Sequence, residues 1–353
     1  MDSNTSLNQP DYLSHTTDHN EIQQIQHIFS NMITQTVENS LSGIGNIFDY
    51  SHGVPNDWLS SFFPQHLLLH QYLLENHKPD ESIVRYAFKV MDRKTNTIIL
   101  EKMPDYTKFG LRLMFDGRVQ RELLHTEAIK HLFAKESLRL GQAFDEPQSR
   151  DHIESFMRMY QLSTDELFQP DLTKYGNFNE FFYRKLKPDA RQIAYPDNSS
   201  IITSVADCRL ILFDNVSDAT RIWIKGQHFS LKRLFDDELM AKTFDYGSIA
   251  VFRLAPNDYH RFHSPVSGQI SKIIRKISGT YYTVNPIVVR ENLDVFTENH
   301  RAVMIIDSKD FGPVAFVAIG ALLVGSINFT VDTEQYVNKG DELGKRMNQL
   351  QFC

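Results

Sequence analysis

The sequence predicts an α+β fold in which a helical N-terminal region is followed by a β-rich domain. Up to about residue 174, apolar residues recur at the three- and four-residue spacing of amphipathic helices. Between residues 200 and 344, short runs rich in β-branched residues alternate with Gly, Pro and Asn, which is typical of strands joined by turns. We therefore expect a mobile tail with a helix at 1–60, a helical region at 61–174 and the β-rich domain at 175–353.

The expected helices follow from the spacing of apolar residues in the first half of the chain. The first 20 residues are polar and lack this spacing, whereas the stretch from Glu21 to about Phe48 shows it clearly. A shorter helix is expected at Leu67–Leu74, before Lys78-Pro79. Further amphipathic stretches lie at 82–92, 108–116, 121–140 and 151–160.

The expected strands are six apolar runs in the second half, after a connector at 188–198. They are IITSV (201–205), RLILF (209–213), RIWIKG (221–226), SIAVFRL (248–254), AVMIID (302–307) and PVAFVAIGALLVGSI (313–327). Residues Asp236–Phe244 form the one clear helical interruption among them.

Composition excludes several classes of protein. Of the 353 residues, 41% are hydrophobic and 23% charged, which excludes a wholly disordered or fibrous chain. The net charge of −7, from 37 basic and 44 acidic residues, opposes binding to nucleic acid. The two cysteines, Cys208 and Cys353, are too few for a disulfide framework or a cysteine zinc site. Neither a secretory signal nor a spanning apolar segment is visible, so we expect an intracellular protein whose membrane contact is peripheral.

The densest polar cluster is RLAPNDYHRFHSPVSG at 253–268. His260 and His263 are three residues apart, and Pro256 and Pro265 indicate a loop or a strand end rather than a helix. Such a pair can consist of structural histidines, of proton-transfer groups or of metal ligands. A metal ion would need further ligands, and no HExxH motif or cysteine pair supplies them.

Other polar residues allow a functional and a structural interpretation. Asp207 in SVADCRL can orient a histidine, as in a catalytic triad, or can cap its own turn. Lys225 can be catalytic or solvated, and Arg301 can bind a carboxylate or phosphate or lie in a solvent-facing loop. Asn285-Pro286 indicates a turn. The chain has no glycine-rich phosphate loop and no GxSxG motif, which disfavours nucleotide binding and an α/β-hydrolase mechanism.

Taken together, eight segments in order resemble the phosphatidylserine decarboxylase family. They are FNEFFYRKLKPDARQI (178–193), SVADCRL (204–210), IKGQHFSL (224–231), RLAPNDYHRFHSPVSG (253–268), GTYYTVNP (279–286), ENHRAVMI (298–305), FGPVAFVAIGALLVGSI (311–327) and KGDELG (339–344). The upstream segment FDEPQSRDHIESF (144–156) is similar to the lead-in helices of the fungal, endomembrane-type members.

The resemblance implies conversion of phosphatidylserine to phosphatidylethanolamine in phospholipid biosynthesis. Loss of CO2 leaves a carbanion that needs an electron sink. The family makes this sink, a covalent pyruvoyl group (pyruvate), by cleaving its own chain before a serine in a Leu-Gly-Ser-Thr-like motif, and the lipid amine forms a Schiff base with it. In the roles carried over, Asp207 orients His263, His263 acts as base on that serine, and His260 assists proton handling during decarboxylation.

The sequence departs from the family after KGDELG. It continues as KRMNQLQFC where the family has an aromatic-rich strand with Gly-Ser-Thr, and no Gly-Ser-Thr occurs anywhere in the 353 residues. Ser326 matches a structural strand serine of the family, and Cys353 has no chain after it. We therefore expect that this chain lacks the final strand and cannot form the pyruvoyl group. A milder departure is Val205, where the family has proline.

Two main hypotheses follow. The first is a phosphatidylserine decarboxylase whose sequence ends early. The second is a catalytically inactive member that binds anionic lipid or an intact paralogue. A metal hydrolase built on the two histidines is a third, disfavoured by missing ligands. The expected partners are phosphatidylserine in membranes and a second copy or an intact paralogue, with no nucleic acid. The expected location is the surface of Golgi- or endosome-type membranes, where the apolar segment 59–74 either lies in the interface or packs as a helix.

Overall fold

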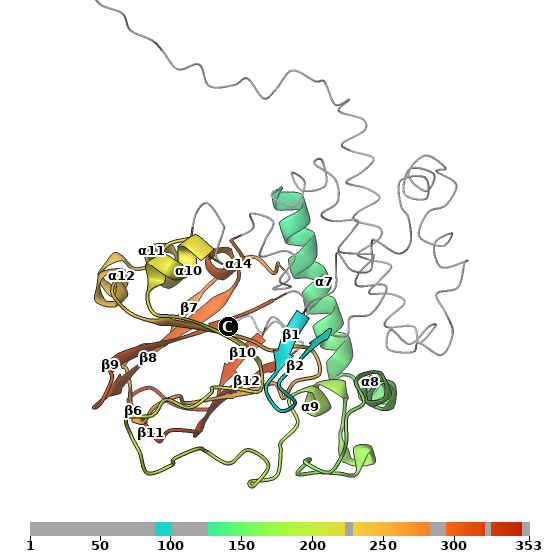
Figure 1. Cartoon of the computed structure of the whole chain (residues 1–353). Coiled ribbons are helices and arrows are strands. Elements are labelled where there is room, and N and C mark those ends of the chain that lie inside the picture. Colours follow the sequence, from blue (N-terminus) through green and yellow to red (C-terminus); the bar gives the residue numbers. More distant parts are fainter. Residues whose placement is uncertain (1–88, 101–125, 223–228, 283–293, 322–325, 348–353) are drawn as a thin grey trace, which may run out of the picture.

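The computed structural model describes residues 89–100, 126–222, 229–282, 294–321 and 326–347 (Figure 1). Within these ranges, helices and antiparallel sheets are both present, which confirms the α+β class. The described strands lie mainly in the second half of the chain, and the long helix α7 flanks them (Figure 1). Several predictions fall outside the described residues: the tail and helix of 1–60, the segments 59–74 and 108–116, Lys225, Asn285-Pro286 and Cys353.

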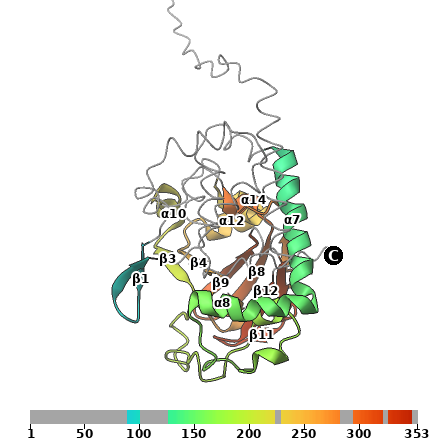
Figure 2. The same cartoon turned by 90° about the vertical axis from the view of Figure 1, so that its right-hand side faces the viewer.

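Three helices form one layer of the molecule. They are α7 (Glu127–Asp145), α8 (His152–Tyr160) and α9 (Phe178–Phe182), with 3-10 turns at Pro147–Asp151 and Leu172–Lys174. Figure 2 shows α7 running along one side and α8 crossing the front of the strands. The helices expected at 121–140 and 151–160 are thereby confirmed, with α7 extending five residues beyond the expected end.

An aromatic cluster holds this helical layer together. It joins α7, α8 and α9 through Phe144, Ile153, Phe156, Phe178, Phe181 and Phe182, all of them buried. The rings of Phe156 and Phe178 meet edge to face with centroids 5.4 Å apart, a favourable geometry for aromatic pairs. Partly buried Leu186 packs on the same cluster, so this core continues beyond residue 175. The division into three segments stays a prediction.

Five strands form the central sheet. In spatial order they are β11 (Tyr336–Val337), β6 (Gly268–Ile270), β8 (Arg301–Ser308) and β7 (Arg275–Ile277), with β9 (Gly312–Ile319) also pairing β8. All of these pairings are antiparallel. The expected strands AVMIID and PVAFVAI are β8 and β9, which confirms that part of the prediction.

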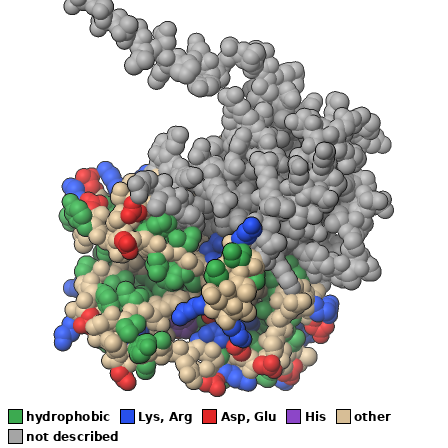
Figure 3. Space-filling view, in the orientation of Figure 1, with side chains coloured by type: hydrophobic (Ala, Val, Ile, Leu, Met, Phe, Trp, Pro, Cys, Tyr) green, Lys and Arg blue, Asp and Glu red, His purple; other side chains and the backbone are tan. Residues whose placement is uncertain are grey.

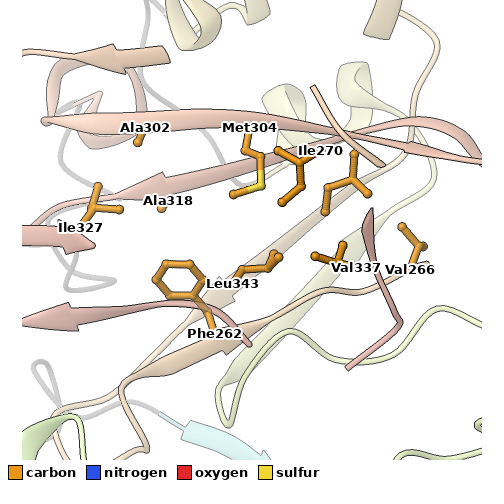
Figure 4. Close-up of a cluster of buried hydrophobic side chains, with 10 residues drawn as sticks. Phe262, Val266, Ile270, Ala302, Met304, Ala318, Ile327, Val337 and Leu343 are labelled. Carbon is orange, nitrogen blue, oxygen red and sulfur yellow. The ribbon is translucent and has the colours of Figure 1, made fainter. Parts of the chain in front are cut away.

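A three-stranded sheet packs against the central sheet. Its order is β10 (Ser326–Phe329), β12 (Glu342–Met347) and β5 (Arg261–His263). Figure 4 shows Met304 and Ile270 pointing from one layer toward Phe262 and Leu343 of the other. Alternation along β8 sends Ala302, Met304 and Ile306 into this core.

The opposite face of β8 is covered by helices. Val303 packs with Leu231, Leu234 and Phe235 of α11 (Leu231–Phe235), beside α12 (Glu238–Phe244). Because β8 is buried on both faces, its sequence reads as a continuous apolar run instead of an alternating one. The helices α10 (Val216–Ile222), α11 and α14 (Val295–Glu298) show that α12 is not the only helical interruption, so that prediction was too narrow.

Two of the short helices begin at capping residues that explain why they form. Asn177 starts α9 by accepting a hydrogen bond from the backbone N–H of Glu180, whose carboxylate reaches back to the N–H of Gly176. Ser230 starts α11 in the same way, accepting from the N–H of Arg233. Such caps satisfy N–H groups that a helix start leaves unpaired, which lets helices of about one turn persist.

Two hairpins complete the described fold. They are β1 (Lys89–Asp92) with β2 (Thr97–Leu100), and β3 (Arg209–Phe213) with β4 (Ile249–Arg253). The strands expected at 209–213 and 248–254 are confirmed as β3 and β4. The helix predicted at 82–92 is wrong for residues 89–92, because cross-strand pairing with Thr97–Leu100 overrides the local pattern. The strand expected at 201–205 is also wrong. The strand expected at 221–226 is wrong for residues 221–222, which end α10, and its other residues lie outside the described ranges.

Candidate functional site

His263 ends strand β5 with its side chain on the face opposite the core. Its neighbour Phe262 is 4% exposed and packs into the core between the two sheets. Because side chains alternate along a strand, Arg261 and His263 point to the other face. The imidazole Nδ1 of His263 lies 2.9 Å from the carbonyl oxygen of Gly340, and Nε2 lies 3.0 Å from the hydroxyl of Tyr259. Pro256 and Pro265 thus bracket a strand end, as the sequence predicts.

Backbone hydrogen bonds bring three distant segments together at this strand end. The N–H of His263 donates to the carbonyl of Val205 at 2.7 Å. The N–H of Ser264 donates to the carbonyl of Asp341, and the N–H of Gly340 donates to the carbonyl of Ser264, both at 2.8 Å. The segments SVADCRL, YHRFHSP and KGDELG therefore meet around one imidazole ring.

Asp207 lies at this corner, but its carboxylate binds Arg191. The guanidinium donates from Nε to both carboxylate oxygens, at 2.9 and 3.0 Å, and from Nη2 to Oδ2 at 2.7 Å. Arg191 also donates to Glu166 at 3.0 Å, and these carboxylates raise the pKa of Arg191 further above its usual value. The family resemblance implies that Asp207 orients His263. In this structure the orienting contact is absent, because Gly340 and Tyr259 hold both ring nitrogens.

His260 lies in the core and not beside His263. It is 2% exposed, and its ring stacks on Phe182 with centroids 3.9 Å apart. Its Nε2 is 3.0 Å from the carbonyl oxygen of Ala255. Alternation along the chain sends the two histidines into different surroundings, so the structure does not bring them together. The role expected of His260 in proton handling stays a prediction.

Tyr259 also belongs to this site, although its residue type and position did not predict it. Its ring stacks on that of His263 with an interplanar angle of 20°. Burial raises the pKa of the Tyr259 hydroxyl to about 12, so it stays protonated at neutral pH. The spacing of four between Tyr259 and His263 in YHRFH was visible in the sequence, but the contact of Gly340 is made by a backbone carbonyl, which leaves no trace in residue type.

Three further polar or reactive residues, Arg301, Ser326 and Cys208, lie in surroundings that suit a structural role. Arg301 is 3% exposed and donates to the backbone carbonyls of Arg233, Leu234 and Asn299, so the expectation of a ligand-binding or solvent-facing arginine is wrong. Ser326 is 4% exposed in β10 and accepts a hydrogen bond from Asn328, as expected of a strand serine. Cys208 is half-buried, and burial raises the pKa of its thiol, which disfavours the thiolate.

Neither a metal site nor a membrane span is found in the described part of the chain. No group of three or more His, Cys, Asp or Glu residues there is arranged to hold a metal ion. Likewise, none of the helices it contains has both the length and the apolar character needed to cross a bilayer. Figure 3 shows hydrophobic, basic and acidic side chains intermingled on the visible face.

The site is thus a strand-end histidine held by a tyrosine hydroxyl and a backbone carbonyl, within an antiparallel α+β fold. Residues 178–345 match the family model of phosphatidylserine decarboxylase. The chain is 36% identical over 254 residues to the phosphatidylserine decarboxylase proenzyme of Fusobacterium nucleatum, an alignment that covers 72% of this chain and 82% of the relative. The chain therefore belongs to the phosphatidylserine decarboxylase family.

The eukaryotic relatives are longer. The chain is 45% identical over 258 residues to phosphatidylserine decarboxylase proenzyme 2 of Komagataella phaffii, covering 72% of this chain and 25% of the relative. It is 43% identical over 258 residues to proenzyme 2 of rice, covering 41% of that protein. The chain thus spans about a quarter of the length of the fungal relative.

The described residues do not fit a pyruvoyl group. The 353 residues contain no Gly-Ser-Thr segment. Ser264 is fully buried and donates to the carbonyl of Val266, while Ser326 is bonded to Asn328. Among the described serines, none makes a hydrogen bond to an imidazole nitrogen of His263. The precursor serine that the family resemblance implies is therefore not among the described residues.

Proposed function

We propose that this chain acts in the conversion of phosphatidylserine to phosphatidylethanolamine, as the part of a decarboxylase that binds the lipid and handles protons. The observation that carries the proposal is the placement of His263 at a meeting point of three family segments, with both ring nitrogens held. An imidazole held in this way can take a proton from a hydroxyl group and return it later. The relatives' names support phosphatidylserine as the lipid.

The proposal assigns distinct contributions to the three residues. His263 is the proton acceptor, and Asp207 follows by two residues Val205, whose carbonyl accepts from the N–H of His263, so that its backbone lies at the same corner. His260 contributes from the core, where its ring packs on Phe182. The reaction needs an electron sink, which the family supplies as a pyruvoyl group. Since none of the described serines fits that role, the proposal assigns the sink to a Gly-Ser-Thr segment, which the 353 residues do not contain.

The second candidate function is lipid or paralogue binding without decarboxylation. This candidate requires no Gly-Ser-Thr segment, and the 353 residues contain none. In either case the protein would act at a membrane surface, because its proposed ligand is a membrane lipid, and the resemblance to the fungal members points to endomembranes. Pairing with a second copy or with an intact paralogue belongs to this proposal as well.

The test is a comparison of the chain with and without a Gly-Ser-Thr segment. The purified chain is incubated with phosphatidylserine liposomes, alone or after co-expression with a segment carrying Gly-Ser-Thr or, as the control, Gly-Ala-Thr. Phosphatidylethanolamine formed with Gly-Ser-Thr only would support the decarboxylase. Liposome binding without product in any sample would favour the second candidate. If the chain neither binds the liposomes nor forms product, both candidate functions are refuted.

A further inference from the structure

Two positively charged residues lie directly opposite each other in the three-stranded sheet. Lys345 of β12 is the cross-strand partner of Arg261 in β5, and its neighbour on the other side is the uncharged Asn328 of β10. Like charges at opposed positions destabilise a sheet. Local rules of this kind are broken mainly at functional sites, so this pair calls for a functional explanation.

Arg261 is held rigidly while one end of its guanidinium stays available. The residue is 6% exposed. Its Nε donates to the carbonyl of Tyr183 at 2.9 Å, and its Nη1 donates to the carboxylate of Glu342 at 2.6 Å. Among the described residues, Nη2 has no hydrogen-bond partner, and this atom is accessible to solvent. It can therefore donate to a ligand without any movement of the rest of the side chain.

Lys345 has only an aromatic ring beside its charge. The residue is half-buried, and its ammonium nitrogen lies 3.9 Å from the centre of the Tyr183 ring. Such a ring attracts a cation but carries no net charge to neutralise it. None of the described carboxylates forms an ion pair with this ammonium. Burial and the nearby Arg261 both lower the pKa of Lys345, as expected for a cation without a counter-ion.

The charged groups that act on Lys345 leave one positive charge in excess. Besides Arg261, they are Lys185, Glu342 and Glu180. The carboxylate of Glu342 already accepts from Arg261, and that of Glu180 already accepts from a backbone N–H. The three cations of this cluster thus outnumber its two carboxylates. One bound anion with a single negative charge would balance it.

We propose that Lys345 and Arg261 form a binding site for one phosphate-type anion, either a phosphodiester or inorganic phosphate. The oxygens of such an anion point in several directions, so one can accept from Nη2 of Arg261 while another binds the ammonium of Lys345. Lys345 is the first residue after KGDELG, where the sequence departs from the family, so the family resemblance does not account for this cation.

The source of the phosphate group follows from the proposed function. Arg261 and His263 lie on the same face of β5, two residues or about 7 Å apart along the strand. In phosphatidylserine, only the ester oxygen and a CH2 group separate the phosphorus from the carbon that bears the amine and the carboxylate. One lipid head group can therefore reach from the anion site toward the end of β5. This assignment rests on the proposed function, whereas the anion site itself does not.

The test is isothermal titration calorimetry of the full chain with two probes, sodium phosphate and glycerophosphoserine, the soluble head group of phosphatidylserine. Sodium acetate at matched ionic strength provides an anion without a phosphate group. We expect saturable binding of at least one probe, with one anion per chain. In Lys345→Met the affinity should fall about tenfold or more, because a charge-assisted contact is lost.

Two variants serve as controls. Lys345→Arg keeps the positive charge and should retain binding. Lys272→Met should bind like the unmodified chain, because Lys272 is 83% exposed and lies outside the cluster. Circular dichroism checks that each variant is folded.

Binding of glycerophosphoserine that depends on Lys345 would support the site with a phosphodiester ligand, and such binding of phosphate alone would support it with a free phosphate. The proposal is overturned if Lys345→Met binds as tightly as the unmodified chain, if acetate binds as tightly as both probes, or if neither probe binds saturably. The phosphate titration needs no lipid and no product. Its failure is therefore distinguishable from a failure of the proposed function in the liposome experiment.

Discussion

Arg191 binds the carboxylate of Asp207 through three hydrogen bonds while also contacting Glu166. This pair joins the connector after the helical layer to the segment that precedes β3. It also withdraws from His263 the acidic group that the family pattern would place beside it. In the structure, the partner of the Asp207 carboxylate is thus a guanidinium and not the imidazole that the sequence predicts.

Replacing Arg191 by glutamine should lower the free energy of unfolding only slightly. The side chains of Arg191 and Asp207 are 45% and 32% exposed, and exposed ion pairs contribute about 1 kcal/mol or less. Urea denaturation at low and high salt measures this, and we expect the difference from the unmodified chain to shrink at high salt because ions screen the pair. A loss that is large and independent of salt would show that Arg191 has a structural role beyond this pair.

Replacing Lys339 by methionine should cost considerably more. Its ammonium donates to three backbone carbonyls of the connector and is buried, and hydrogen bonds to charged groups contribute about 1.5–3 kcal/mol. We expect the free energy of unfolding to fall by about 2–3 kcal/mol, together with faster proteolysis at residues 195–201. The control is Lys272→Met, since Lys272 is 83% exposed. Equal effects of the two substitutions would contradict the argument.

Replacing Gly344 by alanine should disrupt the three-stranded sheet. An added Cβ would lie 2.3 Å from the backbone oxygen of Asn328 and 2.7 Å from the ring of Phe262. Backbone cannot yield there, and overpacking a core costs about 1–3 kcal/mol. Thermal denaturation provides the measurement. Gly176→Ala is the matched control, because its Cβ meets only the flexible end of Glu180 at 3.2 Å, and it should have a much smaller effect.

Protonation of His300 should destabilise the fold. Burial lowers the pKa of this imidazole, and the nearby Lys276 and Arg301 lower it further. The unfolded chain, with an ordinary histidine pKa of about 6.5, then binds more protons than the folded chain, so stability is lost as the pH falls through the interval below that value. The urea midpoint should decrease as the pH is lowered from about 7.5 to about 5.5, and it should decrease less steeply in His300→Gln. An identical slope in the variant would show that another group is responsible.

Much of the fold could be predicted because its signals are local. The helices α7 and α8 follow from apolar spacing, and β3, β4, β8 and β9 follow from runs of β-branched residues. The strand β1 was mistaken for part of an amphipathic stretch because its pairing with β2, and not its own sequence, makes it a strand. The helix α14 was missed because four residues carry too little periodicity, although its cap Asp294 could have indicated it.

The sequence by itself determined the family and singled out the two histidines and Asp207 as candidates, since both steps depend on residue type and order along the chain. Only the tertiary structure decided what each of them touches. It placed His260 in the core against Phe182, gave Asp207 to Arg191, and held His263 between a hydroxyl and a backbone carbonyl. The physical reason is that hydrogen-bond partners are chosen by distance and direction in space. A carbonyl such as that of Gly340, which every residue possesses, becomes specific only when the fold aims it.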